Sequence, residues 1–359
     1  MDKKLSHQIV LLIIIFCNTA FAQNDSTNVS DSIKKEKNIK FNPFPYFSHN
    51  KVLGYYYGGG GMLTYRLQKE DTISPRSTTG AFYVRTTNDT WFSVLFTQMY
   101  FNEDKWRVIA ATGTGLYNFQ TYTELPDSEP DFYDYGSRSV MLSAKVYRKV
   151  YKKNYLGLGY YYSRTKTRFE EAATDSISNN NSLQMLFLRD TRDNVYYPKK
   201  GSKLNAMFTL YPEWMGNVNN FGIFNAYYNR YYGIRNDKDV LAVRAYAKVA
   251  TSTLDFQRQV VINGIDLRGY TDGKYRGDGK VDVQAEYRWN FLPRIGLVGF
   301  GGLGTLYGSE FSEFNGSLYP SGGFGVRYLA IKSTQMRIGL DVARGKDDYA
   351  IYFRIGEAF

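Results

Sequence analysis

The stretch 280–291, KVDVQAEYRWNF, alternates apolar and polar residues along its whole length. Successive side chains of a β-strand point to opposite faces, so the odd-numbered residues form an apolar face and the even-numbered ones a polar face. The apolar face ends in tyrosine, tryptophan and phenylalanine, as the interfacial girdles of membrane barrels do. The same alternation recurs in four further segments, 204–210, 241–249, 336–342 and 349–355.

Two folds produce such segments, a soluble β-sandwich or barrel and an outer-membrane barrel. The segments are near ten residues long, which is the length of a tilted strand that crosses a bilayer. Lipid does not tolerate open sheet edges, and closure of the sheet removes them. Mean hydropathy is −0.42, and beyond the first residues no apolar run is long enough for a spanning helix. We therefore predict an all-β protein, a transmembrane antiparallel β-barrel.

Composition excludes several classes of function. The 359 residues include one cysteine and two histidines, too few for zinc sites, disulfide frameworks or histidine-based catalysis. The formal net charge is +11, but the lysines and arginines are scattered between apolar residues. Scattered charge argues against a nucleic-acid partner. We expect no enzymatic activity, no catalytic residue, no cofactor and no metal.

The N-terminus has the pattern of an export signal. Lys3 and Lys4 precede an apolar core at 9–16, and Ala20-Phe21-Ala22 forms a small-x-small cleavage site. We predict a signal peptide over residues 1–22, cleaved after Ala22, and location in the outer membrane of a Gram-negative bacterium. Residues 23–40 are polar and are expected to form a flexible periplasmic leader. The barrel is expected over 41–359.

Turn residues divide the chain from residue 54 onward into fifteen strand-length segments, ten of them before a long loop. Bacterial barrels have even strand numbers and both ends in the periplasm. We therefore assign 42–50 as a sixteenth strand, whose Pro43 and Pro45 suit an edge-like or irregular strand. The short connections then lie in the periplasm. The loops expected outside are 120–137, 170–180 and 253–278.

Three motifs stand out in the predicted barrel. The first lies in the long loop and comprises Leu267, Arg268, Gly269 and Tyr270. The second is a polar turn that comprises Asp190, Thr191, Arg192, Asp193, Asn194, Tyr197, Pro198 and Gly201. The third is the last segment, with Phe353, Ile355, Gly356 and Phe359.

In this order and spacing, the motifs resemble the BamA/TamA superfamily, the bacterial surface antigen barrels. The resemblance covers essentially all of 41–359 and implies a short member without periplasmic POTRA domains. It implies that the polar turn is a periplasmic turn, and that the last strand is an assembly signal. The polar turn also has a purely structural interpretation, a turn with Asx chemistry that fixes strand register, and we favour it. The terminal aromatic also fits a lipid-facing strand end.

A loop folded into the lumen must pair its guanidinium, because an unpaired charge is costly where water is scarce. Glu286 lies on the polar face of the next strand and is the first candidate partner of Arg268, a role that the resemblance also implies. Asp341 is the second candidate. The alternative is that Arg268 lies at the tip of a solvated external loop. Family members often have an Asp-x-Gly unit on the following strand, where this chain has 302–304, GLG.

Four consecutive glycines, Gly58, Gly59, Gly60 and Gly61, lie in a predicted strand near the seam of the barrel. Glycine raises the entropy lost on ordering and removes cross-strand packing, so the run could weaken a seam that opens. It could equally accommodate sharp curvature or the inserted loop. The sequence leaves both interpretations open.

The resemblance implies a barrel that aids insertion or translocation of proteins, or lipids, at the outer membrane. Its expected partners are outer-membrane lipid, the barrel-assembly machinery during biogenesis, and a periplasmic or outer-membrane protein. The alternative is a passive pore or structural outer-membrane protein with a loop-restricted lumen. In that case lumen charges such as Arg288, Arg327 and Arg337 would tune ion selectivity.

Overall fold

The computed structural model describes the chain from residue 39 onward, with several short gaps. The described ranges are 39–50, 53–123, 131–169, 175–194, 197–254, 258–262, 266–270, 274–331, 335–347 and 349–359. The predicted signal peptide, its cleavage site and most of the predicted leader lie outside these residues. The first strand begins at Ile39, so the last two residues of the predicted leader, 39 and 40, belong to the barrel.

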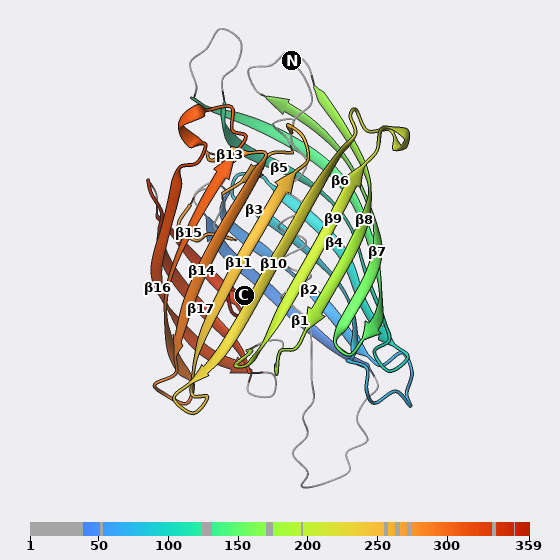
Figure 1. Ribbon diagram of the computed structural model, residues 1–359, viewed down its shortest axis with the longest axis vertical. Helices are drawn as coiled ribbons and strands as arrows, with labels where there is room; N and C mark the ends of the chain where they lie inside the picture. The colour runs from blue at the N-terminus through green and yellow to red at the C-terminus, as the bar shows by residue number, and fades with distance from the viewer. Residues whose placement is uncertain are drawn as a thin grey trace.

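Sixteen strands form one antiparallel sheet in chain order and curl into a barrel (Figure 1). They are β1 (Ile39–Asn50), β2 (Gly54–Tyr65), β3 (Ser77–Thr86), β4 (Trp91–Phe101), β5 (Trp106–Thr123), β6 (Asp131–Tyr151), β7 (Asn154–Phe169), β8 (Ser176–Asp190), β9 (Gly201–Tyr211), β10 (Phe221–Ile234), β11 (Asp239–Ala250), β14 (Gly279–Trp289), β15 (Ile295–Tyr307), β16 (Leu318–Ile331), β17 (Met336–Arg344) and β18 (Tyr349–Ile355). The loop between β11 and β14 holds a separate two-stranded ladder of β12 (Val260–Val261) and β13 (Arg276–Gly277). Short 3-10 helices follow β9, at Glu213–Met215, and β15, at Ser312–Phe314.

The sixteen-stranded transmembrane barrel predicted from the sequence is confirmed, including the proline-containing first strand. Pro43 and Pro45 pair with β2 opposite Gly61 and Gly59. Within the described ranges, no helix is long and apolar enough to cross a membrane. An even strand number places Ile39 and the end of β18 at the same rim, together with short turns such as 102–105 and 235–238. Short turns mark the periplasmic rim of such barrels.

Two of the loops predicted from the sequence are shorter than expected. Strand β6 begins at Asp131, inside the predicted loop 120–137, and β8 begins at Ser176, inside the predicted loop 170–180. Their first residues were interpreted as loop, but they continue the ladders with β5 and β7. A buried hydroxyl pair lies in the β6 extension, between Ser137 and Thr167 of β7 at 2.8 Å. The last strand ends at Ile355 and does not continue to the terminal aromatic, because Gly356 adopts a φ of 91° and turns the chain.

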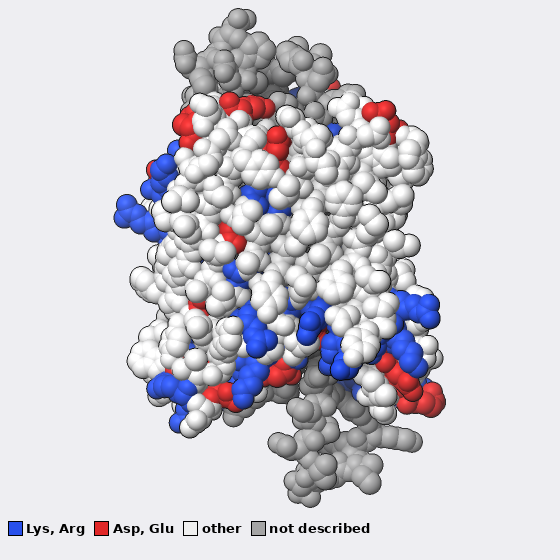
Figure 2. All heavy atoms as spheres, in the orientation of Figure 1, with Lys and Arg blue, Asp and Glu red and all other residues white. Residues whose placement is uncertain are grey.

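The two faces of β14 have opposite environments, as the alternation predicts. Val281 and Val283 on the apolar face are 45% and 50% exposed, whereas Gln284 and Glu286 on the polar face are buried. The apolar face therefore looks outward to lipid and the polar face inward to the lumen. Figure 2 shows that, on the face in view, charged side chains gather mainly towards the rims, above all the lower one.

The lumen wall is not hydrophilic all round, contrary to the expectation from the sequence. The inward face of β2–β7 carries a buried apolar and aromatic cluster, whereas the inward face of β14–β17 carries charges. Phe92 stacks on Tyr117 at 5.9 Å between ring centroids, and Tyr117 stacks on Phe119 at 6.2 Å. The alternation fails as a guide here because both faces of strands β3 and β4 are rich in apolar residues. The wall therefore has an aromatic half and a charged half.

The first and last strands lie side by side where the sheet meets itself. Hydrogen-bonded ladders join every pair of consecutive strands in the sheet, but within the described residues none joins β1 to β18. Strand β1 has 12 residues and β18 has 7, so the two edges differ in length. The seam between β1 and β18 is therefore the one place in the described sheet where two neighbouring strands are not joined by a hydrogen-bonded ladder.

The glycine run lies in β2, one strand away from the seam. A Cβ at Gly58 would be 2.2 Å from the carbonyl oxygen of Tyr83, and one at Gly60 would be 2.3 Å from that of Ala81. A Cβ at Gly61 would touch the ring of Phe41 in β1 at 2.5 Å. The glycines therefore permit the close approach of both neighbouring strands.

One carboxylate, Asp71, organises the connection between β2 and β3. Its Oδ1 accepts hydrogen bonds from the backbone N–H of Ile73 at 3.1 Å and of Ser74 at 2.9 Å. Its Oδ2 accepts from the Ser74 hydroxyl at 2.6 Å and from the N–H of Glu103, in the next turn, at 2.9 Å. Desolvation raises the pKa of Asp71, but the hydrogen bonds, led by that of Ser74, outweigh it and lower the pKa to about 2.

This lowered pKa predicts a component of acid sensitivity. The pKa of Asp71 rises to its ordinary 3.8 on unfolding, so its contribution is complete above that value and is lost as the pH falls towards 2. In urea titrations at pH 6 and pH 3, we expect wild type to lose more stability on acidification than Asp71→Asn. An equal loss in the two proteins would contradict this assignment.

Candidate functional site

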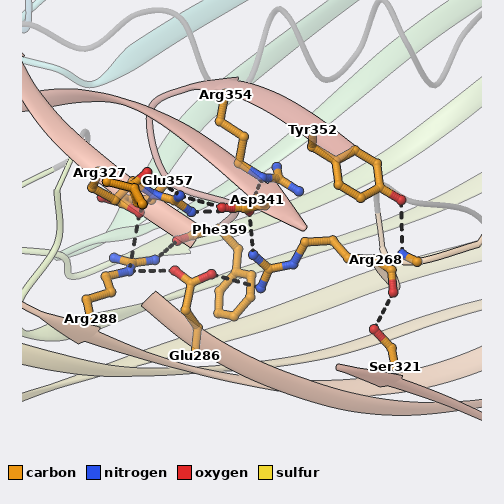
Figure 3. Close-up of polar contacts among 12 residues, drawn as sticks. Arg268, Glu286, Arg288, Ser321, Arg327, Asp341, Tyr352, Arg354, Glu357 and Phe359 are labelled. Carbon is orange, nitrogen blue, oxygen red and sulfur yellow. Dashed lines mark hydrogen bonds and ion pairs between the residues drawn. The ribbon is translucent and has the colours of Figure 1, made fainter. Parts of the chain in front are cut away.

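The loop between β11 and β14 enters the lumen and places its motif against the charged half of the wall. Leu267, Arg268 and Tyr270 are each at most 3% exposed. Arg268 Nη2 lies 2.8 Å from Oε2 of Glu286 on β14, and Nη1 lies 2.9 Å from Oδ2 of Asp341 on β17 (Figure 3). One guanidinium thus bridges two carboxylates on strands that are not adjacent, and its Cζ lies 3.3 Å from the ring centroid of Phe300.

Other charges of the wall extend this bridge into a network. Asp341 also binds Arg327, and it lies 2.7 Å from Nε of Arg354 on β18. Glu286 also binds Nε of Arg288 at 2.8 Å. Arg268, Glu286 and Asp341 are fully buried. Because water does not reach them, the negative charges of the carboxylates must be compensated by the guanidinium groups. Two carboxylates thereby hold four guanidinium groups.

Glycines make room for this arrangement. Gly269 has a φ of 102°, and a Cβ there would lie 2.5 Å from the backbone of Arg344 and Gly345. Its N–H donates to the hydroxyl of Tyr352 on β18 at 3.0 Å, and the Ser321 hydroxyl donates to the carbonyl of Arg268. The backbone of the loop apex therefore touches β16, the β17–β18 turn and β18.

The residues flanking Arg268 pack on both sides of the network. Cβ atoms at Gly302 and Gly304 would lie 2.9 Å and 3.1 Å from Leu267, so the GLG unit of β15 leaves space for that side chain. The Tyr270 hydroxyl donates to the carbonyl of Pro320 at 2.6 Å and accepts from the N–H of Lys346 at 3.2 Å. Each motif residue thus has its own contact with the wall.

A second group of charges fixes the loop closer to β11. Lys280 Nζ lies 2.9 Å from Oδ2 of Asp266 and donates to the carbonyl of Val261 at 3.0 Å. Arg244 on β11 lies 3.2 Å from the other oxygen of Asp266. This group was not predicted from the sequence. The alternation alone places Lys280 on the inward face, next to the loop.

The polar turn after β8 is held by its own side chains. Both oxygens of Asp190 bind Arg192, at 2.9 Å and 2.7 Å. Asp193 Oδ1 accepts hydrogen bonds from three backbone N–H groups, those of residues 194, 199 and 200, and Asn194 Oδ1 accepts from the N–H of Tyr197. After Pro198, Gly201 begins β9 with a φ of 94°, and a Cβ there would lie 2.2 Å from a backbone oxygen. These contacts order the turn.

The terminal segment does not follow the predicted course. After Gly356 the chain turns into the lumen, where Glu357 Oε2 lies 3.0 Å from Nε of Arg327. The carbonyl of Phe359 accepts a hydrogen bond from Arg288 at 2.7 Å, and its ring packs against the cluster around Tyr197. The expectation of a lipid-facing terminal aromatic was therefore wrong for Phe359. The side chains of Phe353 and Ile355 lie outside the described part.

The structure thus brings the three sequence motifs together at Arg288, which lies near Tyr197 of the turn, Phe359 of the terminus and Glu286 of the Arg268 bridge. Sequence reasoning missed Tyr352, Arg354 and Glu357. The alternation of β18 already places Tyr352 and Arg354 inward. Glu357 was not identified because the last strand was expected to continue to the terminal aromatic.

A membrane-spanning β-barrel with a loop clamped in its lumen defines the class of protein. The sequence profile of the Omp85 superfamily domain matches residues 57–359, and the chain belongs to the Omp85 superfamily, an assembly and translocation family of the outer membrane. Comparison with curated proteins gives no match.

Solved structures show the same fold at low sequence identity. BamA from Haemophilus ducreyi lacking POTRA domains 1–3 has a TM-score of 0.64 at 14% identity, over 96% of this chain and 77% of that one. CdiB from Escherichia coli has 0.67 at 12%, over 90% and 63%. CdiB from Acinetobacter baumannii has 0.61 at 13%, over 89% and 60%. The chain thus spans less than two thirds of either CdiB chain.

Proposed function

We propose that this barrel aids the insertion or translocation of proteins at the outer membrane, and that the β1–β18 seam is where a client strand joins. The observation that carries the proposal is the absence of a hydrogen-bonded ladder between β1 and β18 within the described residues. Every other pair of neighbouring strands in the sheet is joined by such a ladder. Unpaired N–H and C=O groups at a strand edge form a template for another strand.

The composition of the seam supports opening rather than permanent closure. Pro43 and Pro45 give β1 two residues without an N–H donor, and the shorter β18 covers only part of its length. The glycine run in β2 removes side-chain packing directly behind β1. Each feature lowers the free energy needed to separate the two edges.

The lumen loop is coupled to the same seam. Tyr352 and Arg354 of β18 bind Gly269 and Asp341, so β18 is attached to the clamped loop on its lumen side. If β18 is displaced, these contacts must either break or move together with the strand. We propose that the position of the loop apex controls the freedom of β18.

The remaining parts of the proposal follow from the sequence. An exported precursor cleaved after Ala22 would reach the outer membrane, where the barrel-assembly machinery would recognise the last strand. A periplasmic or outer-membrane protein partner would deliver clients. The polar turn from Asp190 to Gly201 would serve to fix strand register. No enzymatic step is part of this proposal.

A passive pore with a loop-restricted lumen is the second candidate, and the charged half of the wall favours it. The two candidates differ in what the seam does. A pore conducts through the lumen whether or not the seam is locked, and planar-bilayer recording would give a steady conductance. A loop-blocked insertase gives small and erratic currents.

A disulfide across the seam tests the proposal. The sequence's one cysteine lies in the predicted signal peptide, so cysteine pairs can be placed between β1 and β18 in a cysteine-free mature chain. Liposomes that contain the reduced variant should accelerate folding of an added unfolded eight-stranded barrel, followed by its heat-modifiable gel mobility. The oxidised variant should not accelerate it. Equal rates for the oxidised and reduced forms would overturn the proposal.

A further inference from the structure

The outer face of β7 changes character from one end to the other. Its outward residues begin with Leu156 and Leu158, which are 53% and 71% exposed. The half-buried Tyr160 and Tyr162 follow, and then come three exposed cations, Arg164, Lys166 and Arg168. The intervening residues Ser163, Thr165 and Thr167 are buried and face inward.

Strand β6 adds a fourth cation to this face. Arg138 is exposed and stands directly opposite Lys166 in the ladder, while the apolar Val140 stands opposite Arg164. Like charges directly opposite each other destabilise a sheet unless a counter-ion is present. We name the four residues, Arg138, Arg164, Lys166 and Arg168, the basic face.

The internal charge compensation of the basic face is incomplete. Asp175 lies 2.6 Å from Lys166 and 2.7 Å from Arg168. Arg138 and Arg164 make no hydrogen bond or ion pair with any residue that the structure describes. Two guanidinium groups therefore point outward with their donors available. A guanidinium binds a phosphate through two parallel hydrogen bonds.

The level of the basic face in the membrane identifies what it meets. Tyrosines mark the boundary between hydrocarbon and headgroups, and the cations lie one to three outward positions beyond them. They lie at the rim opposite to the short turns, which is the external rim. Cations at this depth lie at the level of lipid headgroups.

We propose that the basic face binds the phosphate groups of an anionic lipid headgroup in the outer leaflet. The lipid would lie with its acyl chains along Leu156 and Leu158 and its phosphates on Arg138 and Arg164. This inference concerns the outside of the barrel and does not depend on the opening of the seam.

The test uses the folded, detergent-solubilised protein and diphosphoryl lipid A as the probe, with bound lipid counted by native mass spectrometry. The variant R138Q/R164Q/K166Q/R168Q should bind lipid A at least about tenfold more weakly than wild type. The matched control R148Q/K152Q/R189Q/R230Q removes the same charge at the other rim and should change binding less than about twofold. Heat-modifiable gel mobility reports whether each variant is folded.

A smaller variant keeps the test decisive if the fourfold change impairs folding. R138Q/R164Q removes only the two guanidinium groups without partners among the described residues, and it should weaken lipid A binding about threefold or more. Dephosphorylated lipid A should bind all the proteins weakly and alike. Equal losses in the basic-face and control variants would overturn the proposal. Competition by inorganic phosphate at the same concentration as lipid A would also overturn it, because the site would then recognise free phosphate.

Discussion

Replacing Arg268 by alanine should lower the free energy of unfolding by about 3–5 kcal/mol, because it breaks two buried ion pairs at once and removes one guanidinium from each of two buried carboxylates. Glu286 and Asp341 are both 0% exposed, and each loses a guanidinium contact shorter than 3 Å. Urea unfolding of the folded protein in detergent, followed by tryptophan fluorescence, measures the loss. Limited proteolysis should also cut the released loop.

Lys274 offers a matched control in the same loop. Its ion pair with Asp347 spans 3.3 Å, and both side chains are substantially exposed. Exposed pairs of this kind contribute less than about 1 kcal/mol, so Lys274→Ala should leave the unfolding midpoint almost unchanged. Arg268→Lys keeps the charge but cannot bridge two carboxylates with a planar fork, and it should fall between wild type and alanine. Equal midpoints for Arg268→Ala and Lys274→Ala would refute the bridge.

Substitution of Gly269 by valine should displace the loop apex from the wall. Its φ of 102° disfavours any other residue, and a Cβ would lie 2.5 Å from the backbone of Arg344 and Gly345. Backbone strain costs about 1–3 kcal/mol and overpacking about 1–3 kcal/mol. We expect a lower unfolding midpoint and rapid proteolysis within the loop.

Gly316 separates the steric part of this effect from the backbone part. It has a φ of 70°, and a Cβ there would meet nothing within 4 Å. Gly316→Ala should therefore lose stability only through the left-handed backbone conformation. Gly269→Ala should lose stability through the backbone conformation and also through the steric overlap. If both alanine variants lose the same stability, the close approach of the loop to the β17–β18 turn has no energetic weight.

The alternation of apolar and polar residues was enough to predict the barrel, because a strand that faces lipid on one side and a polar lumen on the other must alternate. It identified the inward positions of Glu286 and Asp341 for the same reason. It failed where that environment changes. Strands β6 and β8 continue past the segments in which apolar and polar residues alternate regularly, and β3 and β4 carry apolar residues on both faces.

The network around Arg268 could be predicted only in part. An inward carboxylate on the next strand is a local inference, but the bridge to Asp341 joins residues 73 positions apart and depends on how the sheet curves. Glu357 and Phe359 join the network because one residue, Gly356, turns the chain out of the strand direction. Glycine permits such a turn without requiring it, so the sequence alone did not reveal the inward course of the terminus.

We infer that Arg268 holds the loop inside the lumen through direct charge pairing with the wall. A double-mutant cycle of Arg268→Ala and Asp341→Asn measures that pairing as a coupling free energy of unfolding. We expect a coupling of about 1–3 kcal/mol, since the two side chains lie in one buried network. A coupling within about 0.3 kcal/mol of zero would mean that the two residues act independently, and it would contradict the clamped loop.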